Sequence, residues 1–109
     1  MEEKEKILIK LRLAATLRKI FEQNKKTKND SVTLVKNVRQ LEAASGLSFN
    51  IVQGVYSARR DIQLTSLITL VEEGLEMKFS DFVKMFDAIS VEEIKEVKKD
   101  IAMAKKSRE

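Results

Sequence analysis

The chain has 109 residues, with 21 lysines and arginines against 17 aspartates and glutamates, a formal net charge of +4, and neither cysteine nor histidine. The missing residue types exclude disulfides, Cys/His zinc sites, thiol nucleophiles and histidine relays. A chain of this length supports one modest core but not an elaborate catalytic cleft as well. We therefore expect a protein that is not an enzyme and has no catalytic site, cofactor or metal.

The N-terminal residues show no targeting or membrane pattern. The stretch MEEKEK mixes acids and bases, and the apolar run that follows it is interrupted by Lys10 and Arg12. A signal peptide or a membrane span needs a longer uncharged run. We therefore expect a cytoplasmic protein with no membrane partner.

The absence of proline, together with only three glycines, predicts an all-α fold, a compact bundle of five to six helices. The first helix is expected from about Glu3 to about Gln23. Its apolar residues recur at intervals of three and four and are Ile7, Leu11, Ala14, Leu17, Ile20 and Phe21. The polar stretch NKKTKND, residues 24–30, predicts an exposed loop after it.

A second helix is expected to begin at a cap formed by Asp30 or Ser31 and to end at Ser45. Its expected buried face consists of Val32, Leu34, Val35, Val38, Leu41 and Ala44. Gly46 should then take a left-handed conformation that ends the helix. Ser48 should cap a short third helix from about Phe49 to about Ser57, so the chain turns sharply between the two helices.

The remaining helices are predicted from stops and caps. A fourth helix carries Leu64, Leu67, Ile68, Leu70 and Val71 and stops at Gly74, and Ser80 starts a fifth that contains Phe82, Val83, Phe86 and Ile89. The string SVEE, Ser90 to Glu93, is a capping box that starts a sixth. The apolar seam of that helix, Ile94, Val97, Ile101 and Ala104, must be buried either against the N-terminal helix or against a second copy. A homodimer through residues 91–105 is one of these two alternatives.

The charges are unevenly distributed along the chain. Residues 18–60 hold nine bases against three acids, whereas residues 61–87 hold two bases against six acids. This asymmetry predicts a basic side, which a phosphate backbone would prefer, and an acidic side.

Apolar residues stand where two helices joined by a tight turn need them, at Leu41, Leu47, Val52 and Val55 around Gly46. With these side chains inside, Asn50, Gln53, Gly54 and Ser57 lie on the opposite face of the third helix. The stretch VRQLEAASGLSFNIVQ, Val38 to Gln53, and the stretch SARRDIQLTSLITLVEEGLEMKFSDF that begins at Ser57 resemble the lambda-repressor-like, Xre-type helix-turn-helix family over about residues 7–89.

The resemblance implies a helix-turn-helix domain over residues 1–89 and a C-terminal helix over residues 90–109 for docking or dimerisation. Three positions depart from the family pattern: Glu42 replaces an alanine, Ala58 a glycine and Ile62 a proline. Glu42 lies at a close helix contact, so its carboxylate must face solvent or pair with a partner such as Arg39.

The family implies a transcriptional regulator, a repressor, that binds double-stranded DNA sequence-specifically with residues 49–57 in the major groove. The expected base contacts are Phe49, Asn50, Gln53 and Ser57, and the expected phosphate contacts are Lys36, Ser48, Arg59 and Arg60. Phe49 has burial in the core as its alternative. Two other functions remain open: a protein-interaction module, such as an antitoxin-like partner protein, and a non-specific DNA binder that uses only the basic side.

Overall fold

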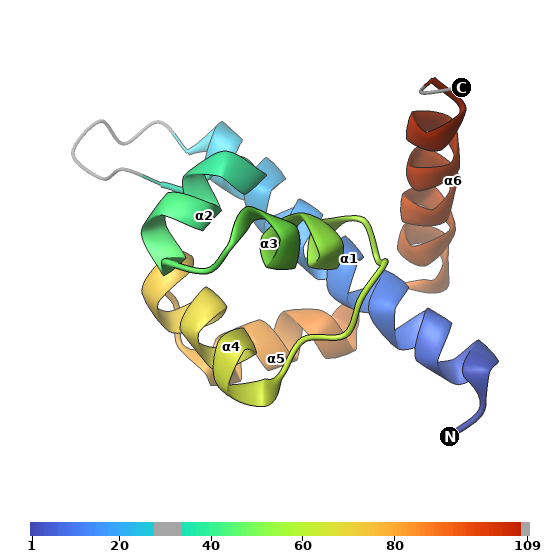
Figure 1. Ribbon diagram of the computed structural model, residues 1–109, viewed down its shortest axis with the longest axis horizontal. Coiled ribbons are helices and arrows are strands. Elements are labelled where there is room, and N and C mark those ends of the chain that lie inside the picture. The colour runs from blue at the N-terminus through green and yellow to red at the C-terminus, as the bar shows by residue number, and fades with distance from the viewer. Residues whose placement is uncertain (28–33, 108–109) are drawn as a thin grey trace.

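The computed structural model describes residues 1–27 and 34–107, which form six α-helices, one π-helical turn and no strand. In chain order these are α1 (Glu3–Lys26), α2 (Val38–Ser45), α3 (Phe49–Tyr56), α4 (Leu64–Thr69), η1 (Leu70–Gly74), α5 (Phe79–Ala88) and α6 (Val91–Ser107). The long helix α1 runs through the molecule, with α2 to α5 on one side of it and α6 on the other (Figure 1). The predicted all-α bundle is confirmed.

Helix α1 extends further than the sequence pattern predicts. It ends at Lys26 rather than near Gln23, so the first residues of the predicted loop belong to its last turn. Lys25 and Lys26 are favourable there because cations stabilise the negative end of a helix dipole. Asn24 also fixes this end, since its Nδ2 donates a hydrogen bond to the carbonyl of Val35 at 2.7 Å. Residues 28–30 of the predicted loop lie outside the described residues.

Helix α2 begins later than predicted, at Val38. The expected caps Asp30 and Ser31, and the expected buried Val32, lie outside the described residues, but residues 34–37 are not helical. Asn37 supplies the cap instead: its side chain accepts a hydrogen bond from Gln40 N at 2.9 Å, while Gln40 Oε1 accepts one from Lys36 N at 2.8 Å. The first bond satisfies one free N–H group of the helix start, and the second ties the helix to the residue before its cap.

One predicted member of the buried side of α2 is exposed. The expectation that Ala44 is buried is wrong, because the inward face of α2 carries Val38, Leu41 and Ser45 and leaves Ala44 exposed.

Many of the predicted apolar residues form one main core between α1 and the helices α2 to α5, whereas the predicted Ile7, Leu64 and Val83 are exposed. Its buried members are Leu17, Ile20, Phe21, Val38, Leu41, Val52, Val55, Leu70, Val71, Leu75 and Phe82. Helix α5 begins at Phe79, one residue before the predicted Ser80.

The fourth predicted helix divides in two. It is α-helical to Thr69 and then widens into η1, which ends at Gly74 as the sequence predicts. A Cβ at Gly74 would lie 2.6 Å from Leu41 Cδ1 and 3.0 Å from Ser45 Cβ. A glycine at this position therefore lets η1 pack closely against α2.

Helix α6 packs against α1 and forms a second, smaller core with it. The buried members of this cluster are Leu11, Ala14, Ala15, Ile89, Ile94 and Val97, with Ile101 half-buried beside them. Of the two alternatives for the apolar seam, the structure shows docking onto α1 for Ile94 and Val97. Ala104 does not join this contact and is exposed, so its expected burial within the chain is wrong.

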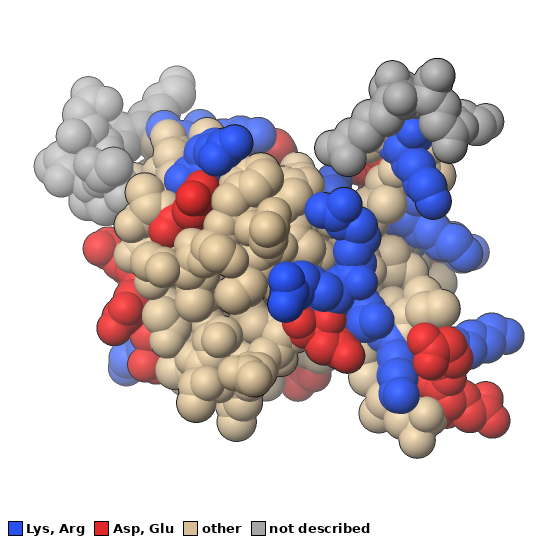
Figure 2. All heavy atoms as spheres, viewed as in Figure 1, with Lys and Arg blue, Asp and Glu red and all other residues tan. Residues whose placement is uncertain are grey.

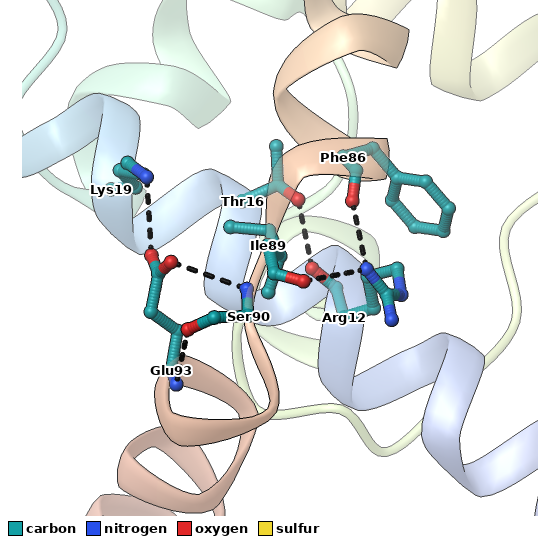
Figure 3. Close-up of polar contacts among 7 residues, drawn as sticks. All are labelled: Arg12, Thr16, Lys19, Phe86, Ile89, Ser90 and Glu93. Carbon is teal, nitrogen blue, oxygen red and sulfur yellow. Dashed lines mark hydrogen bonds and ion pairs between the residues drawn. The ribbon is translucent and has the colours of Figure 1, made fainter.

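The start of α6 is fixed by the predicted capping box. Ser90 Oγ accepts a hydrogen bond from Glu93 N at 3.1 Å, and Glu93 Oε1 accepts one from Ser90 N at 3.2 Å (Figure 3). The second carboxylate oxygen of Glu93 pairs with Lys19 Nζ on α1 at 3.2 Å. The hydrogen bond from the Ser90 backbone and then the one from Lys19 lower the pKa of Glu93.

The change Glu93→Gln should reduce the pH dependence of folding. Because the pKa of Glu93 is lowered in the folded state, its stabilisation is fully present above the ordinary value of 4.5 and is lost as the pH falls through the lowered pKa. Between neutral pH and this range, the free energy of unfolding should fall less steeply in the variant than in the wild type. At neutral pH the two should differ by about 0.5 kcal/mol, since the ion pair is partly exposed.

Urea denaturation at a series of pH values measures both quantities. Glu92→Gln is the control, because Glu92 is exposed on the same turn and takes no part in the cap. It should keep the acid dependence of the wild type. A Glu93→Gln variant whose curve follows that of the wild type at every pH would show that the carboxylate contributes nothing.

Candidate nucleic-acid interface

The turn between α2 and α3 has the conformation that its residues predict. Gly46 takes a left-handed conformation with φ of 76°, and its N–H donates to the carbonyl of Glu42. Ser48 Oγ accepts a hydrogen bond from Ile51 N at 3.3 Å, which caps α3. Leu47 is half-buried between these two residues and packs against the main core. The predicted glycine stop and serine cap are both confirmed.

The two helices are held together by the apolar residues predicted for this purpose. Leu41 and Val52 have no exposed surface and Val55 is 1% exposed, while Leu47 packs beside them. Since this side of α3 is fully used by the core, the opposite side is fixed in direction. The outward side of α3 therefore stays at the surface of the molecule.

The outward side of α3 carries Asn50 and Gln53. Asn50 is exposed, Gln53 is half-exposed, and neither side chain makes a hydrogen bond within the described residues. Gln53 also lines two grooves, which share Arg18 and Tyr56 as lining residues. Both amide side chains therefore keep their donors and acceptors for a ligand.

Gly54 does not lie on this open side, although the sequence pattern places it there. It is buried beneath the side chain of Arg60, whose Cδ and Cγ occupy the space that a Cβ at Gly54 would need. The sequence pattern misses this because the covering side chain comes from the turn after α3. The aliphatic part of Arg60 packs on the helix, while the residue as a whole remains exposed.

Ser57 follows the last residue of α3, and its hydroxyl is engaged within the chain. Ser57 Oγ donates a hydrogen bond to the carbonyl of Gln53 at 2.6 Å and accepts one from Arg59 Nε at 2.9 Å. The second bond positions the exposed Arg59 beside the end of α3. Within this structure the Ser57 hydroxyl therefore positions Arg59, and its proton is not available to donate to a DNA base.

Phe49, at the start of α3, is half-buried and packs against the main core. The guanidinium carbon of Arg39 lies 4.0 Å from the centre of its ring, a distance typical of a cation–π contact. Arg39 also pairs with Glu42 at 3.5 Å, which is the partner that the sequence predicts for this carboxylate. Phe49 therefore has one face in the core and another beneath Arg39.

Arg18 was not predicted as a site residue, yet it fixes the C-terminal end of α3. Its Nε and Nη2 both donate to the carbonyl of Tyr56, at 3.3 and 3.1 Å, and its guanidinium lies 3.9 Å from the centre of the Tyr56 ring. A cation at this position satisfies a carbonyl that the helix leaves unpaired. The sequence gives no signal for it, because residues 18 and 56 meet only in the folded chain.

The predicted phosphate-binding residues flank α3 at both ends. Lys36 is exposed just before α2, Ser48 is exposed at the start of α3, and Arg59 and Arg60 are exposed after its end. A groove of about 700 Å³ lies between α3 and the C-terminal half of α1. Its cations are Arg18, Lys25, Lys36 and Arg39, and its acids are Glu22 and Asp100. Figure 2 shows further basic side chains between the body of the molecule and α6.

No helix within residues 1–27 and 34–107 combines the length and the hydropathy that a membrane span requires. In the same residues, no three acidic side chains gather around a point that one metal ion would occupy. Comparisons with protein-family models, with curated proteins and with solved structures find no match.

Proposed function

We propose that this protein is a cytoplasmic transcriptional regulator, a repressor of the Xre type, that binds double-stranded DNA with α3 in the major groove. The observation that carries the proposal is the α2–α3 unit. A left-handed glycine and a serine cap join two helices whose apolar sides are fully buried, so α3 presents an outward side with unpaired amide groups. A helix-turn-helix reads bases with an outward second helix of this kind, which supports the proposal.

The chemistry of the outward side of α3 fits base recognition. A carboxamide offers one donor and one acceptor side by side, which matches the N6 and N7 edge of adenine. Asn50 and Gln53 both have this group available. Phe49 keeps only its uncovered edge for a thymine methyl, and Ser57 contributes by orienting Arg59. Asn50 and Gln53 are therefore the residues that we assign to readout.

Phosphate binding would place the helix in register. Ser48 uses its oxygen to accept from Ile51 N, which leaves the hydroxyl proton to donate to a phosphate oxygen. Arg59 and Arg60 lie at the other end of α3, with Arg59 held by Ser57. Lys36 and Arg39 line the adjoining groove and extend the same basic surface.

The double change Arg59→Ala/Arg60→Ala tests the proposal. The wild type should bind a random-sequence duplex with an affinity that falls steeply as salt rises, and the variant should flatten the plot of log affinity against log salt by about two units. Fluorescence anisotropy measures this slope. The matched control is Lys95→Ala/Lys99→Ala, which removes two exposed charges from the side of α6 that lines neither groove beside α3.

Three results separate the proposed function from its alternatives. Equal slopes for the two double variants would remove Arg59 and Arg60 from the interface. No binding of the wild type at low salt would favour the protein-interaction module. For readout, Asn50→Ala should reduce the preference for a selected site over random DNA and leave the random-DNA affinity unchanged, whereas a non-specific binder would show no preference to lose.

A homodimer would suit a two-fold symmetric operator, since paired recognition helices about one DNA turn apart read both half-sites. Residues 91–105 would contribute to it only through their outward side. Ile94 and Val97 are already buried against α1, whereas Val91, Met103 and Ala104 are exposed. Sedimentation of the wild type with and without an operator duplex measures the oligomeric state.

A further inference from the structure

A second groove of about 540 Å³ lies beside α3, between its C-terminal end and α6, over one side of α1. Its floor is apolar and consists of Ile7, Leu11, Tyr56, Ala58, Ile101 and Ala104. Its charged lining residues are all cations, Arg18, Arg59, Lys98 and Lys105, with no acidic residue among the described ones. Figure 2 shows basic side chains on both sides of this part of the surface.

The cations on the α6 side are available to a partner. Lys98 and Lys105 are exposed and have no ion-pair partner within the described residues. They stand seven residues apart, which places them about 10.5 Å apart along one side of the helix. Arg59 is exposed on the opposite side, where Ser57 holds its Nε, while Arg18 is engaged on Tyr56.

The floor of the groove keeps an apolar group at a backbone position that favours glycine. Ala58 has a φ of 58°, a left-handed conformation that is strained for a residue with a Cβ. Its methyl group lines the groove and packs against the cluster formed by α1 and α6. A glycine would relieve the strain but would remove this part of the apolar floor.

We propose that this groove docks an acidic amphipathic helix of a partner protein. Such a helix would place apolar side chains three and four residues apart on the floor and carboxylates opposite Lys98, Lys105 and Arg59. Charge complementarity selects this occupant, because the rim is cationic and the floor is apolar. A phosphodiester strand would satisfy the cations but would leave the apolar floor without an apolar counterpart.

The docking site overlaps the surface that the proposed function assigns to DNA binding. Gln53, Ser57 and Arg59 line the groove and also lie on the outward side or at the end of α3. A helix seated there would occupy the position that DNA needs. On the basis of the proposed function, binding of the acidic partner and binding of DNA exclude one another.

The experiment uses a fluorescent synthetic peptide of about 18 residues, long enough to form a helix on docking, with leucines on one helical side and glutamates on the other. A scrambled peptide of the same composition controls for net charge. Anisotropy is measured with the wild type, with Lys98→Glu/Lys105→Glu, and with Lys95→Glu/Lys99→Glu. The two variants carry the same charge change on the same helix, but Lys95 and Lys99 do not line the groove.

The patterned peptide should bind the wild type saturably. It should bind Lys98→Glu/Lys105→Glu at least about tenfold more weakly, because two attractions between lysines and peptide carboxylates become repulsions. The control variant should bind within about twofold of the wild type, since its altered charges are exposed and do not line the groove. Ala104→Trp, which fills the groove without changing charge, should also block binding. Circular dichroism checks that each variant is folded.

Several outcomes would overturn the proposal: no binding of the patterned peptide, equal binding of the scrambled one, or equal weakening by the two charge-reversal variants.

Competition with a labelled duplex then tests whether the peptide and DNA exclude one another. Displacement of DNA by the peptide supports it, and simultaneous binding of both overturns it. A wild type that binds the peptide but no DNA would leave the docking site standing and remove the proposed function, whereas binding of DNA alone would do the reverse.

Discussion

Replacing Leu41 with alanine is expected to lower the free energy of unfolding by about 3 to 4 kcal/mol. Leu41 has no exposed surface, and it lies where α2, η1 and the turn before α3 meet. Its Cδ1 fills the space that Gly74 leaves on η1, so truncation would open a cavity between two backbones that cannot easily move together. Losses of this size are typical when a buried leucine leaves a cavity.

Chemical denaturation followed by far-ultraviolet circular dichroism measures the loss. Leu64→Ala is the matched control, since Leu64 is the same residue type on a helix but is 64% exposed. It should change the free energy of unfolding by less than about 0.5 kcal/mol. Similar losses for the two variants would contradict the central place of Leu41 in the core.

Much of the fold can be predicted from local residue patterns. Gly46, Ser48 and the Ser90–Glu93 capping box mark helix ends where the structure has them, because caps act within one turn. The start of α2 cannot be predicted as well. Asn37 is one of several polar residues able to cap, and its bond from Gln40 N, together with the bond from Lys36 N to the Gln40 side chain, appears only in the folded chain.

The candidate site is less predictable, because its details depend on side chains that meet across the fold. The outward position of Asn50 follows from helical spacing once Val52 and Val55 are inward. The covering of Gly54 by Arg60 and the capping of Tyr56 by Arg18 are tertiary contacts with no sequence pattern. The groove between α3 and α6 was missed for the same reason, since it needs the docking of α6 to form.

The position of α6 depends in part on one side chain of α1, Arg12. Its Nη1 donates to two carbonyls at the end of α5, those of Phe86 at 3.2 Å and Ile89 at 2.8 Å (Figure 3). Its guanidinium also lies 5.8 Å from the centre of the Phe86 ring. Because α6 begins two residues after Ile89, these bonds fix the direction in which the chain leaves α5.

The change Arg12→Met should therefore lower the free energy of unfolding by about 2 to 3 kcal/mol. Methionine keeps the apolar length of the side chain but leaves two carbonyls at the end of α5 without their charged donor, and hydrogen bonds to charged groups contribute about 1.5 to 3 kcal/mol. Arg12→Lys should lose less, since an ammonium still reaches a carbonyl but lacks the guanidinium plane that lies over the Phe86 ring. The same denaturation assay measures both variants.

Lys10→Met controls for the loss of one positive charge from the same part of α1, and it should change the free energy of unfolding by less than about 0.5 kcal/mol. A loss for Arg12→Met no larger than that of Lys10→Met would show that the bonds to Phe86 and Ile89 are not what holds the turn.

If these bonds do hold the turn, Arg12→Met should also weaken docking of the acidic peptide under conditions in which the variant stays folded. Arg12 does not line that groove, so the effect would arise through the direction of α6, whose Lys98 and Lys105 form its rim.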